Sequence, residues 1–252
     1  MKFAEMKQMG LLCGLLMALW QPLAGVASEA EVHLDRAPID TSNQASLQRG
    51  ARVFVNYCLN CHSAAYMRYN RLVDIGLTEA QIKDNLVLTG AKVGDTMKVV
   101  MPAKDAKAWF GAQPPDLTVE ARARGADWLY TYLRGFYRDS SRPTGWNNTV
   151  YDKVAMPHVL WELQGQQVLK TELKRDAHGH ETEVKQLVLD KPGKISPAEY
   201  DATIADLVNY MVFMSEPSKG KRLQLGVIVL LFLGLMFIVS YYLKKEFWKD
   251  VH

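Results

Sequence analysis

A nineteen-residue apolar run without a charge lies near the C-terminal end of the chain, at residues 225–243. At a rise of about 1.5 Å per residue it reaches about 28 Å, which roughly matches the core of a bilayer. A buried helix of a globular domain seldom stays apolar on every face for so many turns, so the run predicts a membrane anchor over residues 223–243. Three Lys or Arg residues lie close to each end of the run, so the charge rule does not orient it.

A second, shorter apolar run, Met9–Trp20, follows Lys2 and Lys7 and precedes a stretch of small residues that ends at Ala27. Its twelve residues are too few to span a bilayer, and small residues at this distance suit a signal-peptidase cut. The pattern predicts a cleavable secretory signal over residues 1–27, with an uncleaved anchor as the alternative. The signal, and not the charge rule, therefore sets the expected orientation.

The segment between these two runs is long enough for one globular domain with a single well-buried core. The orientation predicts that residues 28–222 lie in a bacterial periplasm and that residues 244–252 form a cytoplasmic tail. Residues 28–218 contain 22 Lys plus Arg against 24 Asp plus Glu, although the whole chain has a formal charge of +3. A nucleic-acid partner is excluded because the domain offers no basic surface.

Two amphipathic patterns predict helices that pack on each other. Ser46–Tyr57 repeats buried positions at intervals of three or four residues. Gly50 lies inside this pattern and costs about 1 kcal/mol relative to Ala, so it is either a tolerated flaw or a point of close approach by another helix. The expected partner begins at Ser196, an N-cap followed by proline and, three residues after the cap, glutamate. The apolar positions of the first helix are Leu47, Ala51, Phe54 and Cys58.

The remaining patterns complete a mainly α-helical prediction. Glu120–Tyr137 reads as one aromatic-rich helical stretch. Gln166–Leu173 and Thr182–Leu189 alternate as the strands of a β-hairpin, and the loop between them holds His178 and His180, whose setting favours surface polarity over a metal site. The predicted fold is a mainly α-helical domain with a small β-hairpin insertion and one C-terminal transmembrane helix.

The strongest chemical signal is Cys58-Leu59-Asn60-Cys61-His62. Two cysteines at this spacing followed at once by histidine are typical of covalent attachment of c-type haem, with Cys58 and Cys61 as thioethers and His62 as the proximal iron ligand. A redox dithiol and half of a zinc site are the alternatives. A zinc site needs further ligands, and the other cysteine, Cys13, lies in the predicted signal. The sequence therefore favours haem.

Two details of a haem site stay open on spacing alone. The distal ligand is Met101 or Met156, each of which precedes a proline. Chain order favours Met156, because the rigid Pro114-Pro115 loop is expected on the histidine side before the chain crosses to the distal face. An arginine that pairs with a haem propionate is Arg122 or Arg124, and spacing does not choose between them.

Several short motifs occur together in one order along the mature chain, and together they resemble the cytochrome c1 family, the haem subunits of cytochrome bc1 complexes. The motifs are Gln48-Arg49-Gly50, Cys58 to His62, Ser63, Tyr66, Leu72-Val73, Gly111 to Leu117, Arg122-Ala123-Arg124, Ala155-Met156-Pro157, Glu216-Pro217 and the single C-terminal anchor. The segment 164–194 matches none of the family's motifs, so its role stays open.

The resemblance implies a bacterial-type protein with a cytochrome c-like helical haem domain. It also implies one covalently bound haem c, with Met156 as distal ligand, Pro115 beside the haem and Arg124 at a propionate. It further implies a single-pass subunit of the bacterial inner membrane that takes one electron from a Rieske iron-sulfur protein and passes it to a soluble cytochrome c. Cytochrome b and a dimeric multisubunit quinol–cytochrome c reductase are the implied context, and the subunit needs no catalytic residues of its own. The alternatives are a membrane-tethered cytochrome c that serves an oxidase, and a haem sensor or haem enzyme.

Overall fold

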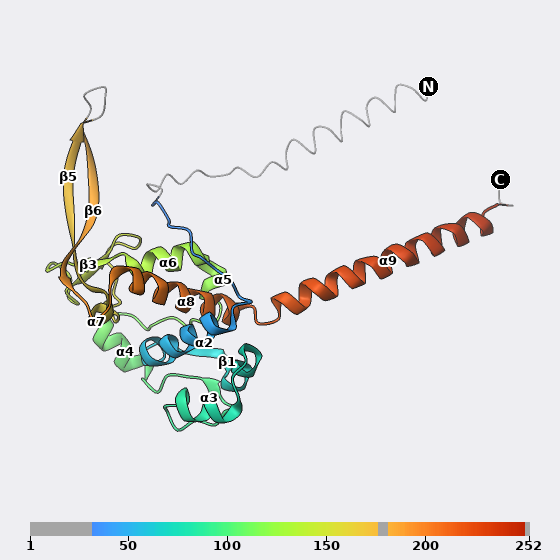
Figure 1. Ribbon diagram of the computed structural model, residues 1–252, viewed down its shortest axis with the longest axis horizontal. Coiled ribbons are helices and arrows are strands. Elements are labelled where there is room, and N and C mark those ends of the chain that lie inside the picture. The colour runs from blue at the N-terminus through green and yellow to red at the C-terminus, as the bar shows by residue number, and fades with distance from the viewer. Residues whose placement is uncertain (1–31, 176–180, 250–252) are drawn as a thin grey trace. The chain divides into compact units, whose positions relative to one another are not determined.

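A computed structural model describes residues 32–175 and 181–249 (Figure 1). The predicted signal over residues 1–27, His178 and His180 lie outside the described residues. The fold class is confirmed, since helices dominate and the strands form three small antiparallel pairs. The helices are α2 (Gln44–Val53), α3 (Glu79–Asn85), α4 (Ala103–Phe110), α5 (Glu120–Arg124), α6 (Ala126–Arg134), α7 (Trp161–Gln164), α8 (Pro197–Ser215) and α9 (Lys219–Phe247), with a 3-10 helix at Tyr69–Ile75. The strands are β1 (Ala64–Arg68), β2 (Thr96–Met97), β3 (Phe136–Arg138), β4 (Trp146–Asn148), β5 (Gly165–Arg175) and β6 (Glu181–Pro192).

Helix α8 is central to the domain that carries the haem motif, because α2, α5 and α6 all pack against it. Its N-terminus is the predicted capping box: the Ser196 side chain accepts the Glu199 backbone N–H at 3.3 Å, and the Glu199 carboxylate accepts the Ser196 N–H at 2.8 Å. The apolar stripe that the sequence predicts is buried. Its members Tyr200, Ile204, Leu207, Met211 and Met214 are all at most 3% exposed.

Gly50 marks the contact between α2 and α8. A Cβ at this position would overlap the backbone carbonyl of Asp206 and lie 2.7 Å from the Tyr210 Cβ. The close approach that the sequence left as one of two explanations is therefore confirmed, because no larger residue fits between the two backbones. An ion pair from Arg49 Nε to Asp206 at 2.5 Å lies beside this contact.

The end of the first predicted helix differs from the expectation. The α-helix stops at Val53, and one turn of π-helix covers Phe54–Cys58, closed by the Leu59 N–H donating to the Phe54 carbonyl at 3.0 Å. Three consecutive apolar side chains at residues 53–55 are buried here, and a regular α-helix does not direct three successive residues to one face. The wider turn accommodates them just before the haem motif, in keeping with the use of π-turns at functional sites.

The prediction of one helix over Glu120–Tyr137 is wrong. Gly125 adopts φ +91°, in the left-handed region that favours glycine, and it separates α5 from α6. Phe136 and Tyr137 belong to β3, which pairs with β4. The aromatic residues keep a helical spacing past both ends of α6. Only Gly125 and Gly135 indicate that the helix is interrupted there.

The predicted β-hairpin is confirmed and is longer than expected. β5 pairs with β6 from Gly165↔Pro192 to Arg175↔Glu181, with one irregularity between Gln166 and Gln167. Its base is joined to the domain because the Gln167 side-chain amide donates to the carbonyls of Arg134 and Phe136 at 2.9 and 3.0 Å.

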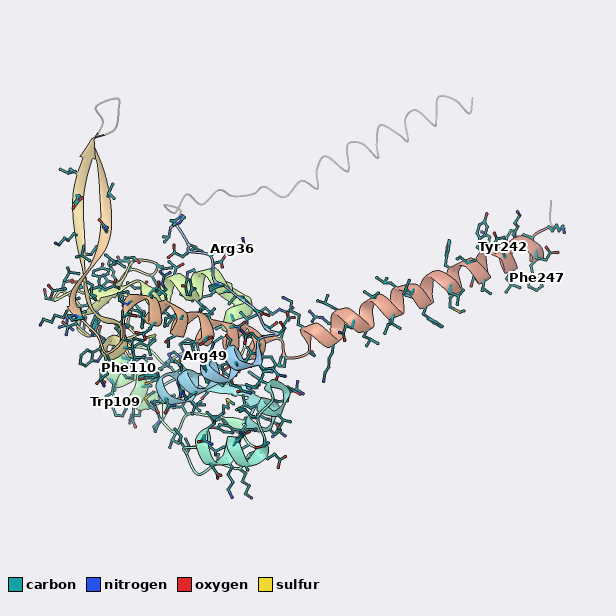
Figure 2. The ribbon with its side chains drawn as sticks, in the orientation of Figure 1. Arg36, Arg49, Trp109, Phe110, Tyr242 and Phe247 are labelled. Carbon is teal, nitrogen blue, oxygen red and sulfur yellow. The ribbon has the colours of Figure 1, made fainter. Side chains whose placement is uncertain are left out.

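Helix α9 covers the predicted anchor and extends beyond it at both ends. It has 29 residues and a mean hydropathy of 2.6 in its most apolar window, and none of that window is buried within the described structure. Side chains radiate from it on all sides, with Tyr242 and Phe247 near its C-terminal end (Figure 2). By length and composition it can cross a bilayer.

The contact at Gly50 generates the first prediction. Gly50→Ala should lower the free energy of unfolding by roughly 1–3 kcal/mol, since the added methyl group forces the α2 and α8 backbones apart. Denaturant unfolding followed by circular dichroism measures the change. Gly94→Ala is the matched control, because nothing lies within 4 Å of a Cβ at that position. Equal stability of the two variants would contradict the close packing of α2 on α8.

Candidate functional site

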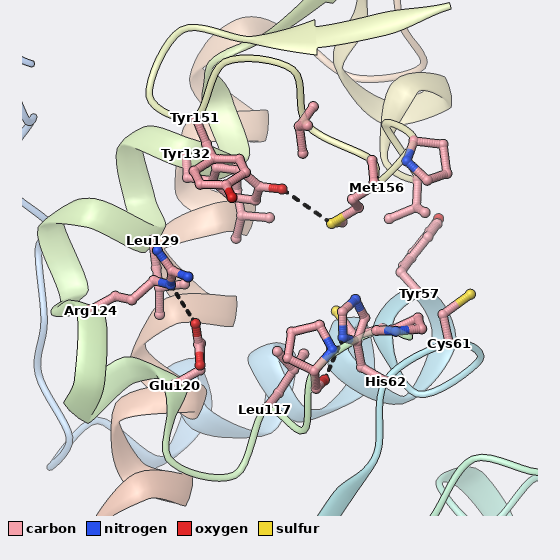
Figure 3. Close-up of a pocket in the computed structure, with 18 of the residues that line it drawn as sticks. Tyr57, Cys61, His62, Leu117, Glu120, Arg124, Leu129, Tyr132, Tyr151 and Met156 are labelled. Atoms are coloured by element: carbon pink, nitrogen blue, oxygen red, sulfur yellow. Dashed lines mark hydrogen bonds and ion pairs between the residues drawn. The ribbon is translucent and has the colours of Figure 1, made fainter. Parts of the chain in front are cut away.

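The six residues that the haem motif and the family resemblance assign to the site line one cavity of about 310 Å³. A volume of this order, about 300 Å³ or more, is typical of small-molecule and cofactor sites. The walls are largely apolar, with Leu129, Leu133 and Leu207 among them. Figure 3 shows His62 on one side of the cavity, Met156 on the facing side and Arg124 at a third edge. The six residues are Cys58, Cys61, His62, Pro115, Arg124 and Met156.

The haem motif forms a single tight turn after the π-helix. The backbone N–H groups of Cys61 and His62 both donate to the Cys58 carbonyl, at 3.1 and 2.9 Å. This turn holds two sulfurs and one imidazole on the same wall of the cavity. The arrangement can form two thioether bonds to one edge of a flat macrocycle while the imidazole lies against its face.

The tautomer of His62 follows from its hydrogen bond to Pro115. Nδ1 lies 2.8 Å from the Pro115 carbonyl oxygen, and a carbonyl oxygen can only accept, so Nδ1 carries the proton and Nε2 is bare. Burial lowers the pKa of His62, which keeps the ring neutral. A neutral imidazole oriented by a backbone carbonyl is the form that binds metals. Pro115 thus contributes through its backbone oxygen.

The two thiols are poorly suited to the redox-dithiol alternative. Burial raises the pKa of Cys58 to about 12, with a smaller contribution from Cys61, and burial also raises the pKa of Cys61. Reactive cysteines have the opposite shift, since the thiolate is the nucleophile. The zinc alternative also lacks ligands, because no group of three His, Cys, Asp or Glu residues that could hold a metal occurs within residues 32–175 and 181–249.

The two methionine–proline pairs lie in different places. Met156 lines the cavity with His62, whereas Met101 lines a neighbouring cavity of about 230 Å³ with Ser63 and Asp116. The Tyr132 hydroxyl donates to the Met156 Sδ at 3.5 Å (Figure 3). The hydrogen bond fixes the position of the thioether, and it occupies one sulfur lone pair while leaving another free.

Tyr132 is the functional residue that sequence reasoning missed. Its ring is stacked on Trp128, with centroids 4.7 Å apart and planes at 12°, and it meets Phe136 edge-on at 5.1 Å. Burial raises the pKa of Tyr132, so the hydroxyl stays protonated and remains a donor. Trp128, Tyr132 and Phe136 recur at a spacing of four residues, which is typical of core packing. This spacing gives no sign that one hydroxyl reaches the loop that carries Met156.

The loop that carries Met156 is held by buried asparagines. Asn148, 2% exposed, donates from Nδ2 to the Tyr132 carbonyl at 2.8 Å, and its Oδ1 accepts the Val150 N–H at 2.8 Å. Nearby, His158 is stacked on Phe136 at 4.8 Å. The loop that carries Met156 is therefore joined to α6 through Asn148 on its N-terminal side and to β3 through His158 on its C-terminal side. The Gly, Asn and Pro content of the segment predicted a loop but not its anchors.

The structure separates the two arginines that spacing left equivalent. Arg124 lines the cavity; its Nε donates to Glu120 at 2.5 Å and its guanidinium lies 4.5 Å from the Trp128 ring centre. Arg122 lies outside the cavity and pairs with Glu216 at 3.3 Å. Only Arg124 is placed to meet a carboxylate within the pocket.

An apolar cavity with a Cys-x-x-Cys-His turn on one wall, a methionine on the other and a membrane-length helix downstream defines a membrane-anchored c-type cytochrome. The residues fit a haem: the walls suit a macrocycle, two cysteine sulfurs are available for thioether bonds, and a bare imidazole nitrogen and a methionine sulfur are candidate iron ligands. The model of the Cytochrome C1 family matches residues 35–190 and 192–251, and the chain belongs to this family.

Relatives from several organisms resemble the chain over most of its length. A protein named "Ammonia monooxygenase gamma subunit" from Nitrosomonas europaea is 53% identical over 94% of this chain and 97% of its own. Cytochrome c1 of Allochromatium vinosum is 48% identical over 93% and 96%. The mitochondrial cytochrome c1 haem protein of Saccharomyces cerevisiae is 23% identical over 90% and 74%.

Family membership establishes the role of the chain in outline. It is an electron-transfer haem subunit of the cytochrome bc1 complex, a multisubunit membrane assembly of the respiratory chain, and it carries one covalently bound c-type haem. It is anchored in the membrane, and α9 is the described helix with the length and composition for that task.

Proposed function

We propose that this chain passes one electron from a Rieske iron-sulfur protein to a soluble cytochrome c. The observation that carries the proposal is that His62 and Met156, which are far apart in the sequence, line one apolar cavity beside the Cys58–Cys61 turn. A haem held there supplies reversible one-electron chemistry between ferric and ferrous iron. The protein needs no acid, base or nucleophile for this step.

Each residue of the cavity has a separate task in the proposal. Cys58 and Cys61 form the thioether bonds, and His62 Nε2 is the proximal ligand. The Pro115 carbonyl holds the imidazole proton at Nδ1. Met156 Sδ is the distal ligand, and a methionine in this position raises the reduction potential.

Arg124 at the edge of the cavity pairs with a haem propionate. Its guanidinium has five donors, and its Nε donates to Glu120, so the terminal N–H groups can donate to a second carboxylate. The ring of Trp128 beneath the guanidinium excludes water from one side of the pair and favours this geometry. Arg122 takes no part in it.

The setting of the subunit follows from its two ends. We propose that residues 1–27 are removed, that residues 28–222 lie in the periplasm, and that residues 223–243 cross the bacterial inner membrane once, with residues 244–252 in the cytoplasm. Cytochrome b and the Rieske protein are the expected neighbours within a dimeric complex. With His62 and Met156 both bound, the iron would keep no open position, which argues against a haem sensor or haem enzyme.

A second candidate function comes from the relative named "Ammonia monooxygenase gamma subunit", which is 53% identical to this chain. If this chain were instead a subunit of a monooxygenase, a haem held in the same cavity would supply electrons to that monooxygenase. A membrane-tethered cytochrome c that serves an oxidase is a further alternative with the same haem and anchor. All three functions use one electron-transfer site, so the proteins that accompany the chain distinguish them.

Purification in mild detergent tests the assignment. The chain should co-purify with cytochrome b and a Rieske protein, and the preparation should reduce soluble cytochrome c with quinol as the electron donor. Haem should remain on the chain in a denaturing gel and should be lost from the Cys58→Ala/Cys61→Ala variant, because thioethers survive unfolding. Co-purification with an oxidase or a monooxygenase instead would reject the bc1 partners.

Replacement of the distal ligand gives the sharpest test of the site. Met156→Ala should lower the reduction potential markedly and allow carbon monoxide to bind the ferrous protein, since the thioether that favours ferrous iron is gone. Met101→Ala should leave the potential nearly unchanged and cost packing only. Redox titration with carbon monoxide difference spectra measures both. The reverse result would make Met101 the ligand.

Tyr132→Phe tests the hydrogen bond to the ligand sulfur. A donor on the thioether withdraws electron density and disfavours ferric iron, so its loss should lower the reduction potential by up to about 60 mV. Tyr130→Phe is the matched control, because Tyr130 lies on the same helix and does not line the cavity. An equal shift in the two variants would show that the hydroxyl does not act on Met156.

A further inference from the structure

A cluster of charges lies where α8 ends and α9 begins. We call Arg122, Glu216, Lys219 and Arg222 the junction cluster. Glu216 Oε1 accepts from Arg222 Nη2 at 3.0 Å and from Arg122 Nη1 at 3.3 Å. The backbone N–H of Lys219 donates to the Glu216 carbonyl at 3.1 Å, which brings a third cation to the junction. One carboxylate is thus shared by two guanidinium groups, one from α5 and one from α9.

The cations face solvent while the anion is covered. The Glu216 side chain is 19% exposed, against 67% for Arg122 and 60% for Arg222. Each guanidinium has five donors, and Glu216 is the only ion-pair partner of either arginine within the described part of the chain. Hydrogen bonding to Arg222, together with Arg122 and Lys219 nearby, lowers the pKa of Glu216, so the carboxylate stays ionised. A net positive surface with unused donors remains.

The position of the cluster along α9 matches one layer of a bilayer. Counted back from Leu225, where the apolar run starts, Arg222 and Lys219 lie about 4 and 9 Å along the helix axis. The polar headgroup layer on each side of the hydrocarbon core is about 5–7 Å thick. When residues 225–243 fill the core, Arg222 therefore lies at the depth of the lipid phosphates, and Lys219 lies just beyond the headgroup layer, within reach of it through its long side chain.

The geometry points to a binding site for the phosphate of an anionic phospholipid, formed by Arg122 from α5 and by Lys219 and Arg222 from α9. Guanidinium groups match phosphate oxygens with paired N–H donors, and cations beside a membrane helix attract anionic headgroups. Because Lys219 and Arg222 belong to the same helix as the membrane-spanning segment, we favour a lipid headgroup over an acidic protein segment as the ligand. A phosphate held between Arg122 and Arg222 joins the haem domain to its anchor through charge-assisted hydrogen bonds.

The site acts on a helix that also borders the haem. α5 carries Arg122 towards the junction and Glu120 and Arg124 along the cavity. A phosphate that holds Arg122 in one conformation therefore also restricts the motion of α5, which forms part of the cavity wall. The inference requires only that α9 spans a membrane, and it does not depend on the electron donor or acceptor.

Binding of short-chain phosphatidylglycerol and phosphatidylcholine to the full-length haem-loaded chain in detergent tests the site. The natural chain should prefer phosphatidylglycerol, and Arg122→Gln/Arg222→Gln should weaken its binding about thirty-fold. The control Arg52→Gln/Lys83→Gln removes two exposed charges elsewhere and should keep the preference. Glu216→Gln removes the competing anion and should bind phosphatidylglycerol at least as tightly.

Four results would overturn the proposal. They are equal binding of the two lipids by the natural chain, retention of the preference in the double arginine variant, equal loss in the control, and displacement of the lipid by an equal concentration of inorganic phosphate. Loss of cytochrome b from the arginine variant with unchanged lipid binding would assign the cluster to an acidic protein segment instead. Haem content and reduction potential, measured on the same samples, report separately on the electron-transfer role.

Discussion

The contact of α2 with α8 at Gly50 is the constraint on which the haem pocket depends. It lets two helix backbones meet without an intervening side chain, and α2 continues directly into the turn that carries the cysteines and His62. The same α8 also supports α5 and α6, which bring Arg124 and Tyr132 to the cavity. Because α8 is shared, the separation of the two walls is set by the packing of α2, α5 and α6 on this one helix.

Hydrogen bonds then fix the two loops that complete the walls. The Pro115 carbonyl accepts a hydrogen bond from His62 Nδ1–H, and Asn148 joins the methionine loop to the end of α6. Asn148 is buried, so its side-chain amide must keep its partners or cost about 1–3 kcal/mol. This requirement confines loops without regular structure to one conformation. Fixed ligands suit electron transfer, since little rearrangement accompanies a change in the charge of the iron.

The sequence predicted the parts of the structure that are encoded locally. The haem turn, the Ser196 capping box, the hairpin and the apolar anchor each depend on neighbouring residues. For Gly50 the sequence left two explanations, a tolerated flaw or a close approach by another helix, and the contact with α8 decides between them. The division between α5 and α6 escaped prediction because the aromatic spacing outweighed a single glycine at 125. Short elements between residues 64 and 110, such as the 3-10 helix at Tyr69–Ile75, were not predicted because they are too short to show a hydrophobic periodicity. The Tyr132 bond to Met156 was invisible because it joins segments that only the fold brings together.

The two arginines of α5 show how one short helix separates two tasks. Residues two positions apart on a helix point about 200° away from each other, so Arg124 faces the cavity whereas Arg122 faces the start of α9. Sequence spacing could not assign them, because arginine suits both a position that faces a carboxylate in the cavity and a position that pairs with Glu216. Once α5 is packed on α8, the direction of each side chain is fixed by geometry. The charge that faces the haem pocket and the charge that faces the membrane boundary are therefore held by the same turn of helix, and any movement of α5 alters both.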